Sequence, residues 1–342
     1  MRRTVPFVRR GLLLLLAVPV SLGLAAGAGP AARRPLCAVP KAAADGAPEI
    51  SPNGSFVLFR RREPGCPLRG SVWRSDLAGR HLLRVLRPTV LLGRVSWRRD
   101  GLISATLTTR RLTVLLSTAG AVVGRVPITD PFWAPDSTHA GYVQDGQIYL
   151  WPGAAIVGGG PNLVSAPTWS PDSTDVAYSR VLGISRGELV VGKIDGSASS
   201  VVFSSSAIGQ PQWSPDGRLI AVVSGSPQTL YVTTPDGAAV KNLTPRFARV
   251  GDLPAWSRDA RWIAFTGKRA GGWGLYIVHT DGTRLRRIAR RGIVAPNASL
   301  SWYPHNSAVA FESSTARCPR LGIFAARASG AGSYRLTNRC QP

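Results

Sequence analysis

The sequence predicts an all-β protein, a seven-bladed β-propeller with four antiparallel strands in each blade. Three observations predict it: a short phrase recurs seven times, an apolar run of strand length follows each copy, and turn residues separate these segments. The phrase reads Trp-Ser-Pro-Asp in its clearest copies, at 169–172 and 213–216. The first residues of the seven copies, here called the anchors, are Ile50, Trp97, Trp133, Trp169, Trp213, Trp256 and Trp302.

The spacing of the anchors indicates one blade per repeat. From position 50 to position 302 the chain covers 252 residues in six intervals, a mean of 42. A four-stranded propeller blade requires a repeat of about this length. Seven anchors therefore predict seven blades that follow one another along the chain.

The first two strands of each repeat, A and B, are expected to form a hairpin. Strand A ends at the anchor, and in most repeats a continuous apolar run begins seven residues later, as in Val176-Ala177-Tyr178 and Ile220-Ala221-Val222. Repeat two is one residue shorter and has Ile103-Ser104-Ala105. Such runs suit strands covered on both faces, and the small middle residue leaves room for the next sheet. The Pro-Asp-Gly segment or its relatives between anchor and run are typical of a tight turn.

The last two strands, C and D, are expected to form a second hairpin. Leu230-Tyr231-Val232 and Leu275-Tyr276-Ile277-Val278 are examples of strand C. The turn to strand D is marked by Asp195-Gly196, Asp236-Gly237, Asp281-Gly282, Gly79, Gly120 and Gly330. The series begins with a strand A and ends with a strand D. We therefore expect that no strand is shared between blades one and seven where the ring closes.

Together these residues resemble the TolB-like β-propeller family, with WD40-like repeats that read Trp-Ser-Pro-Asp-Gly, Ile-Ala-Phe, Ile-Tyr, Asp-Gly and Leu-Thr. Repeats four to six match this pattern best, down to Leu243-Thr244, and Leu336-Thr337 closes the last repeat. Repeats two and three match poorly, and the resemblance covers roughly residues 47 to 340. It implies a disc with a central channel that binds proteins or small ligands in the bacterial cell envelope. It implies no reaction, because fold alone does not determine chemistry.

The chain is expected to divide into a signal peptide at residues 1–28, an extended lead-in at 29–46 and the propeller at 47–342. Arg2, Arg3, Arg9 and Arg10 precede an apolar stretch from Gly11 to Leu24, and small residues follow around Ala26 and Ala28. This order is typical of a secretory signal with a cleavage site. A retained membrane anchor is the alternative, although the apolar stretch is short for a membrane span. An exported protein, secreted or held in the cell envelope, is the prediction.

The four cysteines predict two disulfides, because exported proteins meet oxidising conditions. Cys66 and Cys318 lie at the same place in the first and last repeats, between strands B and C. Equivalent places in neighbouring blades are expected to lie too far apart for a disulfide to bridge them. The predicted pairs are therefore Cys37 with Cys66 and Cys318 with Cys340, beside the ring closure. Free thiols are the alternative.

The charge is strongly basic. Removing the four arginines of the predicted signal from the net charge of +24 leaves +20, which would attract an anionic cell-wall polymer. Only four of the 42 basic residues are lysine, and this bias is typical of a GC-rich genome. Arginines such as Arg284, Arg286 and Arg287 fall on a predicted outer strand, where charge protects a sheet edge. No recognition helix or metal finger indicates nucleic-acid binding, which is not expected.

No catalytic or metal-binding group is expected. Gly183-Ile184-Ser185-Arg186-Gly187 matches the serine nucleophile elbow, but it falls between two predicted strands and no helical segment follows it. His81, His139, His279 and His305 have different offsets in their repeats, and no pair has metal-ligand spacing. The aspartates of the Pro-Asp turns are interpreted as turn residues. Neither a cofactor nor a metal is predicted.

A ligand is expected at the channel mouth, where connections from strand D of one blade to strand A of the next converge. The polar residues entering the anchors there are Arg94, Asp130, Gln210 and Asp252. The sequence therefore predicts a non-enzymatic platform for a protein or peptide partner. Two alternatives are an enzyme of lyase or hydrolase type with a site at the channel mouth, and an electrostatic binder of anionic cell-wall polymer.

Overall fold

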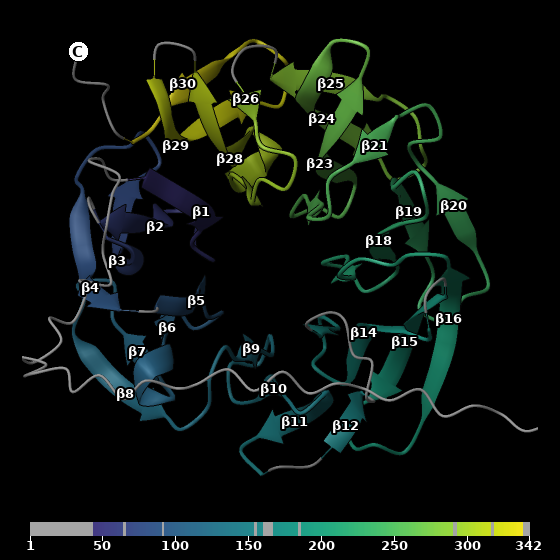
Figure 1. The fold of residues 1–342 in the computed structure, drawn as a ribbon, viewed down its shortest axis with the longest axis horizontal. Coiled ribbons are helices and arrows are strands. Elements are labelled where there is room, and N and C mark those ends of the chain that lie inside the picture. Colours follow the sequence, from purple (N-terminus) through teal and green to yellow (C-terminus); the bar gives the residue numbers. More distant parts are fainter. Residues whose placement is uncertain are drawn as a thin grey trace, which may run out of the picture. The chain divides into compact units, whose positions relative to one another are not determined.

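The computed structural model describes residues 44–63, 66–90, 92–153, 156–159, 167–183, 186–289, 293–315 and 318–337. Within them the regular structure is β-strand, apart from two 3-10 turns at Thr108–Arg110 and Pro304–Asn306. Seven antiparallel sheets surround a common axis (Figure 1). The predicted seven-bladed propeller with four antiparallel strands per blade is confirmed.

The blades follow the chain order, and A to D correspond to the innermost to the outermost strand. Blade one contains β1 (Ala44–Ile50), β2 (Phe56–Glu63), β3 (Cys66–Asp76) and β4 (Leu83–Val90). Blade two contains β5 (Leu92–Trp97), β6 (Ile103–Leu107), β7 (Leu112–Leu116) and β8 (Val122–Val126). Blade three contains β9 (Phe132–Trp133), β10 (Ala140–Gln144), β11 (Gln147–Trp151) and β12 (Ile156–Gly159). Blade four contains β13 (Thr168–Trp169), β14 (Asp175–Val181), β15 (Gly187–Lys193) and β16 (Ser199–Ser205).

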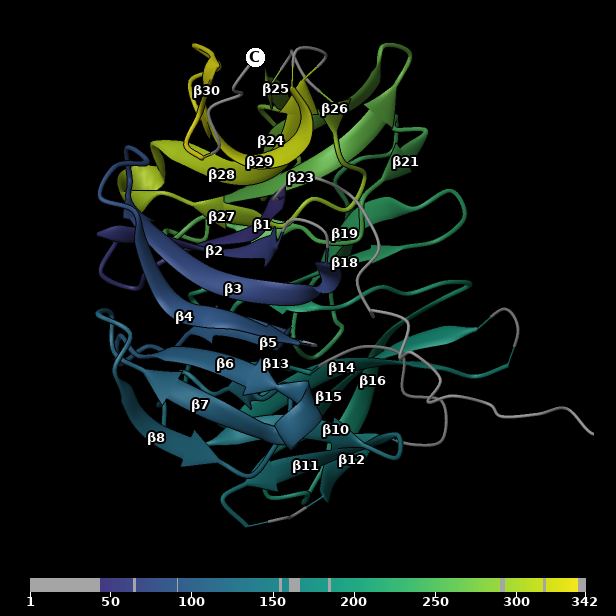
Figure 2. The ribbon, with the colours of Figure 1, turned by 60° about the vertical axis from the view of Figure 1, so that its left-hand side comes forward.

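In the last two blades strand A consists of two pieces that both pair with strand B. Blade five has the ordinary plan of β17 (Gln212–Trp213), β18 (Ile220–Ser224), β19 (Thr229–Thr233) and β20 (Val240–Asn242). Blade six contains β21 (Arg249–Val250), β22 (Ala255–Trp256), β23 (Trp262–Arg269), β24 (Gly272–His279) and β25 (Arg286–Ala289). Blade seven contains β26 (Ile293–Val294), β27 (Leu300–Trp302), β28 (Ala308–Thr315), β29 (Cys318–Arg327) and β30 (Ser333–Arg335). Figure 2 shows these sheets stacked face to face around the ring.

The serine and aspartate of the repeated phrase close the turn between strands A and B. Ser214 donates to Asp216 Oδ1 (2.6 Å) and accepts from the backbone N–H of Leu219 (3.0 Å). Ser170 makes the same two contacts, with Asp172 and with the N–H of Asp175. Both serines are buried, and each hydroxyl satisfies a backbone donor at a half-buried position. The repeated Trp-Ser-Pro-Asp phrase therefore forms a hydrogen-bonded turn between strands A and B, as predicted.

The Leu-Thr pair after strand D has a corresponding role at the outer side of the blade. The backbone N–H of Leu243 donates to the carbonyl oxygen of Leu230 (2.8 Å), and Thr244 Oγ1 accepts from the N–H of Leu230 (2.8 Å). Thr337 accepts in the same way from the N–H of Ile323 (3.1 Å). The threonine side chain thus extends the pairing of strand C beyond the last residue of strand D.

The hydrophobic core lies between blades. One cluster joins Val223 and Leu230 of blade five to Phe265 and Tyr276 of blade six. The small middle residues of strand B, which the sequence predicted to make room for the next sheet, are buried; they are Ser104, Ala177, Ala221, Ala264 and Ala310. Each blade is therefore stabilised mainly by its two neighbours.

Blades one and seven meet without sharing a strand, as expected, and specific contacts join them. The N–H of Ala47 donates to Glu312 Oε1 (2.8 Å), and the N–H of Ile50 donates to Ser301 Oγ (2.9 Å). The Tyr303 hydroxyl donates to the carbonyl oxygen of Leu77 (3.0 Å). An apolar cluster that includes Ile50, Phe59, Ala310 and Ile323 fills the junction. The ring is therefore closed by side-chain packing and by hydrogen bonds.

The predicted signal at 1–28 and most of the lead-in at 29–46 lie outside the described residues, and β1 already begins at Ala44. Cys37 and Cys340 also lie outside them. Cys66 and Cys318 are the first residues of β3 and β29, so they occupy equivalent backbone positions. The two disulfides therefore stay a prediction. No helix in the described part of the chain is both long and apolar enough to cross a membrane.

Candidate functional site

The anchor tryptophans connect the innermost strands of successive blades. Trp169 Nε1 donates to the carbonyl oxygen of Phe132, the residue before the previous anchor (2.6 Å). Trp256 and Trp302 repeat this contact with the carbonyl oxygens of Gln212 and Ala255 (2.9 Å each), and Trp97 repeats it with that of Glu49 (3.2 Å). The same strand position thus joins four pairs of neighbouring blades.

This series is interrupted at two anchors. The indole N–H groups of Trp133 and Trp213 are buried and have no hydrogen-bond partner among the described residues. By the pattern of the others, their acceptors would be the carbonyl oxygens of Ser96 and Thr168. Ser96 and Thr168 line the cavity described next. The two missing contacts therefore lie beside this cavity.

A cavity of about 250 Å³ lies against the innermost strands of blades one to five. We call it the channel cavity. Five of its lining residues directly precede an anchor; they are Glu49, Ser96, Phe132, Thr168 and Gln212. The others are Arg94, Trp97, Trp133, Pro135, Pro167, Trp169 and Gln210. Aromatic walls with a few polar groups are typical of a ligand site.

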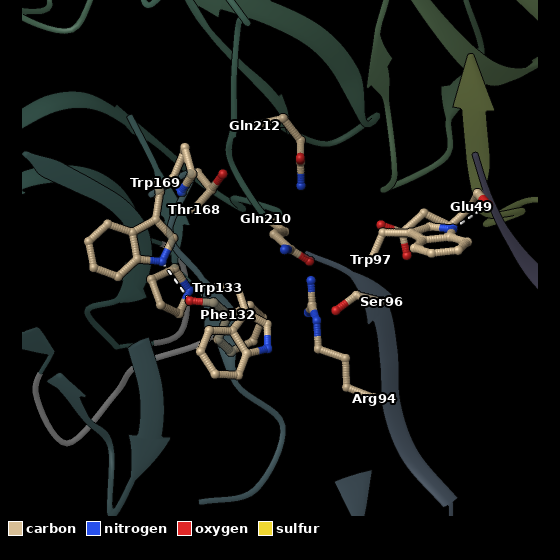
Figure 3. A pocket seen from close by; sticks show the side chains of 12 residues that line it. Glu49, Arg94, Ser96, Trp97, Phe132, Trp133, Thr168, Trp169, Gln210 and Gln212 are labelled. Atoms are coloured by element: carbon tan, nitrogen blue, oxygen red, sulfur yellow. Dashed lines mark hydrogen bonds between the residues drawn. The ribbon is translucent and has the colours of Figure 1, made fainter. Parts of the chain in front are cut away.

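Arg94 is the cationic group of the channel cavity. It lies on β5, and its backbone N–H donates to Asp130 Oδ1 (2.6 Å). Its guanidinium carbon lies 4.2 Å from the ring centre of Phe132, a cation–π contact that holds the side chain. Among the described residues no carboxylate lies within 4.0 Å of this guanidinium. Figure 3 shows the side chains of Arg94 and Gln210 pointing toward one another.

Glu49 is the acidic group of the channel cavity. Desolvation by the surrounding protein raises the pKa of Glu49 to about 7, although the positive charge of Arg94 and a hydrogen bond with the backbone of Trp97 lower it. Glu49 is half-buried. Its carboxyl group therefore changes protonation near neutral pH, and this changes the net charge of the cavity.

The four residues predicted at the channel mouth have different positions. Arg94 and Gln210 line the channel cavity. Asp130 lies behind Arg94 and holds its backbone. Asp252 is elsewhere: Asn297 Nδ2 donates to its Oδ2 (3.1 Å), and the Gln228 amide donates to its Oδ1. The structure thus brings three of the four together and places Asp252 in a separate network.

Buried hydroxyl groups fix the connections that carry these residues. Thr106 Oγ1 on β6 accepts from the N–H of Asp130 (2.9 Å). Ser179 Oγ on β14 donates to the carbonyl oxygen of Gly209, which precedes Gln210 (2.5 Å). Both hydroxyl groups come from strand B of the preceding blade. The positions of Asp130 and Gln210 are therefore determined by the sheets.

Sequence reasoning missed Glu49, Ser96, Phe132, Thr168 and Gln212 as cavity residues. The signal was present, because side chains alternate along a strand. If the anchor points between blades, the residue before it points away from that interface. The position directly before each anchor would have identified these residues. It would not have shown that the cavity is formed by blades one to five.

The other chemical motifs of the sequence lie away from this cavity. The Gly183–Gly187 string connects β14 and β15, and Ser185 falls outside the described residues. His139 Nδ1 lies 2.7 Å from Asp136 Oδ2, and His81 and His279 lie beside Asp76 and Asp281 in the same manner. Within the described ranges, no three His, Cys, Asp or Glu residues are grouped in a way that could hold a metal ion.

The family model of the TolB β-propeller domain matches residues 154–341, a little over half of the chain. Among curated proteins, the chain is 32% identical to the Tol-Pal system protein TolB of Desulfosudis oleivorans over 90 residues, 26% of this chain and 20% of that protein. It is 26% identical to the uncharacterized protein Atu1656 of Agrobacterium fabrum over 198 residues, 52% of this chain and 61% of that protein. The chain thus spans less than two thirds of either relative.

Solved structures with the same architecture include enzymes. A puromycin hydrolase aligns with a TM-score of 0.69 and 16% identity over 87% of this chain and 54% of that one. An oligogalacturonate lyase in complex with manganese aligns at 0.63 and 16%, over 85% and 92% of the two chains. TolB from Acinetobacter baumannii aligns at 0.51 and 14%, over 84% and 61%. At these identities the likeness concerns the fold alone.

Proposed function

This chain belongs to the family of TolB β-propeller domains, and from that membership we propose that it is an exported, non-enzymatic platform for a protein or peptide partner. The partner would be held at the channel cavity. One observation carries the proposal: an aromatic-walled cavity in which Arg94 has no acid partner among the described residues and Gln210 and Gln212 supply amides. Within the described residues these three side chains form no hydrogen bond or ion pair, so their polar groups are available to a ligand.

Binding is tested with peptides selected by phage display on the immobilised full chain. The affinity of a selected peptide, measured by fluorescence polarisation, should fall about tenfold or more in Arg94→Gln, because an ion pair and its hydrogen bonds are lost. Arg110→Gln removes an equal charge from an exposed position in the same blade, and it should bind as the wild type does. Equal affinities in the two variants would exclude the cavity as the binding site.

Export is part of the proposal and is tested separately. It is supported by the four arginines and the apolar stretch Gly11 to Leu24 at the N-terminus. Mass measurement of the protein recovered outside the cytoplasm should show cleavage close to Ala28. A protein that keeps its N-terminus and fractionates with membranes would support the retained anchor instead.

Glu49 favours an enzyme as a second candidate. A carboxyl group with a pKa of about 7 inside a cavity suits a general acid or base. The solved structures with this fold include a hydrolase and a lyase. Incubation with oligogalacturonate and with peptide anilides tests this candidate. Turnover that is abolished in Glu49→Gln would reject the non-enzymatic platform in favour of an enzyme.

A cationic cluster favours attachment to an anionic cell-wall polymer as a third candidate. Arg246, Arg249, Lys268 and Arg269 are exposed in blade six, and Arg249 lies directly opposite Lys268 in the sheet. Like charges at such a position repel one another and destabilise the sheet. A bound polyanion would reduce this repulsion. Polymer binding should weaken steeply with salt, whereas binding in the cavity should respond weakly, since only one charge pair is involved.

A further inference from the structure

The charge of the channel cavity limits the kind of ligand that it can take. Among the described residues of the lining, Arg94 is the only basic one and Glu49 is the only acidic one. A ligand with two or more negative charges would need further cations to replace its lost hydration. One planar group with a single negative charge matches one guanidinium, because both groups can form two parallel hydrogen bonds.

The neutral groups of the lining complement such a ligand. Gln210 points toward Arg94, and Ser96 and Gln212 add a hydroxyl and an amide to the same space (Figure 3). Phe132 stacks on the guanidinium and presents an apolar wall together with the neighbouring indoles. The cavity therefore joins a cationic end with amide groups to the ring of Phe132 and the neighbouring indoles.

We propose that the channel cavity binds a carboxylate group of the partner, with Arg94 as its ion-pair partner and Gln210 as an amide donor. This inference rests on the proposed binding function and names the ligand class. Arg94 is suited to the role because Phe132 and Asp130 hold it in place before a ligand arrives, which lowers the entropy lost on binding. The carboxylate is either the C-terminus of a peptide or an aspartate or glutamate side chain.

The test uses 4-fluorobenzoate as the probe, because fluorine NMR detects weak binding through the broadening of one signal. We expect saturable broadening with the wild-type chain and with Arg110→Gln, and about a tenfold weaker affinity with Arg94→Gln. The neutral analogue 4-fluorobenzamide should bind about tenfold more weakly than the benzoate. Gln210→Leu, which leaves every charge in place, should weaken benzoate binding more than benzamide binding.

Several outcomes would overturn the inference. They are the absence of saturable binding to the wild type, equal affinities for benzoate and benzamide, and equal losses in Arg94→Gln and Arg110→Gln. Peptide selection is an independent experiment, so the two proposals can fail separately. If benzoate binds but no peptide ligand is found, the platform proposal alone is rejected. If a peptide binds equally well without Arg94 and without a carboxylate, the carboxylate site alone is rejected.

Competition distinguishes the two sources of the carboxylate. N-acetyl-alanyl-alanine with a free C-terminus represents a chain end, and N-acetyl-glutamic acid methylamide represents a side chain. Displacement of fluorobenzoate by the first compound assigns the site to a C-terminus, and displacement by the second assigns it to an acidic side chain. Displacement by neither compound would contradict the proposal.

Discussion

Glu49 and Arg94 lie on neighbouring innermost strands, and their charges influence one another. Asp130, before β9, also acts on Arg94. Arg60 on β2 interacts in turn with Asp130 and with Glu312 on β28. Above about pH 7 the Glu49 carboxylate opposes an anionic ligand, and below it the neutral carboxyl group does not. The protonation of one side chain therefore modulates the site.

We predict that fluorobenzoate binds more tightly as the pH falls from about 8 to about 6, by about threefold to tenfold. The probe remains an anion throughout, so the change reports on the protein. In Glu49→Gln the affinity should be high and independent of pH over this range. A pH dependence that persists in Glu49→Gln would assign the effect to another group.

The same residue predicts a pH dependence of stability. The pKa of Glu49 is raised in the folded chain, so unfolding releases protons between its ordinary pKa and about 7, and stability falls as the pH rises through that window. Above about pH 7, Glu49→Gln should unfold with a free energy higher than the wild type by about 3 kcal/mol. Near pH 4 the two should be equal, because Glu49 is then neutral in both states. Urea titrations at both pH values measure this.

Ser214 tests the turn mechanism of the repeat at a single position. Ser214→Ala removes the donor to Asp216 and leaves the half-buried N–H of Leu219 without its acceptor. We expect the free energy of unfolding to fall by about 1 to 3 kcal/mol. The exposed Ser206→Ala is the matched control and should change stability by less than about 0.5 kcal/mol. Equal effects would show that the hydroxyl contributes nothing to the turn.

At the scale of the strand, the indole contacts explain why tryptophan recurs at the end of strand A. Each of four anchors both fills the space between blades and donates to the previous innermost strand. Trp133 fills space without donating, and the guanidinium of Arg98 lies 4.1 Å from its ring centre. The junction of blades two and three therefore lacks the indole bond, and Arg98 and Asp100 of blade two bond instead to Ser137 of blade three.

A pair of substitutions separates the two contributions. Trp169→Phe leaves the carbonyl oxygen of Phe132 without its donor, whereas Trp133→Phe removes an N–H that has no partner among the described residues. Both lose similar volume. We expect Trp169→Phe to cost about 1 to 2 kcal/mol more than Trp133→Phe in chemical denaturation. An equal or reversed order would mean that the indole bonds do not stabilise the ring.

The strands could be predicted because the repeats align with one another, so that every copy supports the interpretation of the others. The buried Ala177 and Ala221, the serine turns and the glycine hairpins are all local patterns. The positive φ angles of Gly196 (73°) and Gly237 (75°) agree with the predicted turns. The cavity could not be predicted in the same way. Whether Arg94 has a partner, and how far the pKa of Glu49 shifts, depends on distances between different blades.

At the scale of the whole molecule, the junction of blades one and seven is the special place. At Gly79 (φ 77°) a Cβ atom would come within 2.3 Å of the carbonyl oxygen of Leu336, so only glycine fits there. Ile50 has no indole, and its N–H donates to Ser301 instead. The closing junction thus replaces the repeated contacts by contacts of its own.

The two predicted disulfides are expected beside this junction. Peptide mapping without reduction should recover Cys37 joined to Cys66 and Cys318 joined to Cys340. Reduction should lower the free energy of unfolding by about 3 kcal/mol per bridge, if constraint of the unfolded chain is the main cause. A peptide that joins Cys66 to Cys318 would contradict the pairing and would place a covalent bond directly across the junction.

Because each sheet is built from consecutive segments, the order of the blades along the chain is separable from their order in space. A gene rearranged to start at β9 and end at β8, with a linker from β30 to β1, would still encode seven intact sheets. Blades seven and one, which the chain does not connect, would then be joined by an ordinary linker. The new chain ends would lie between blades two and three, beside the channel cavity. Such a circular permutant would show whether ligand recognition tolerates a break in the wall that forms it.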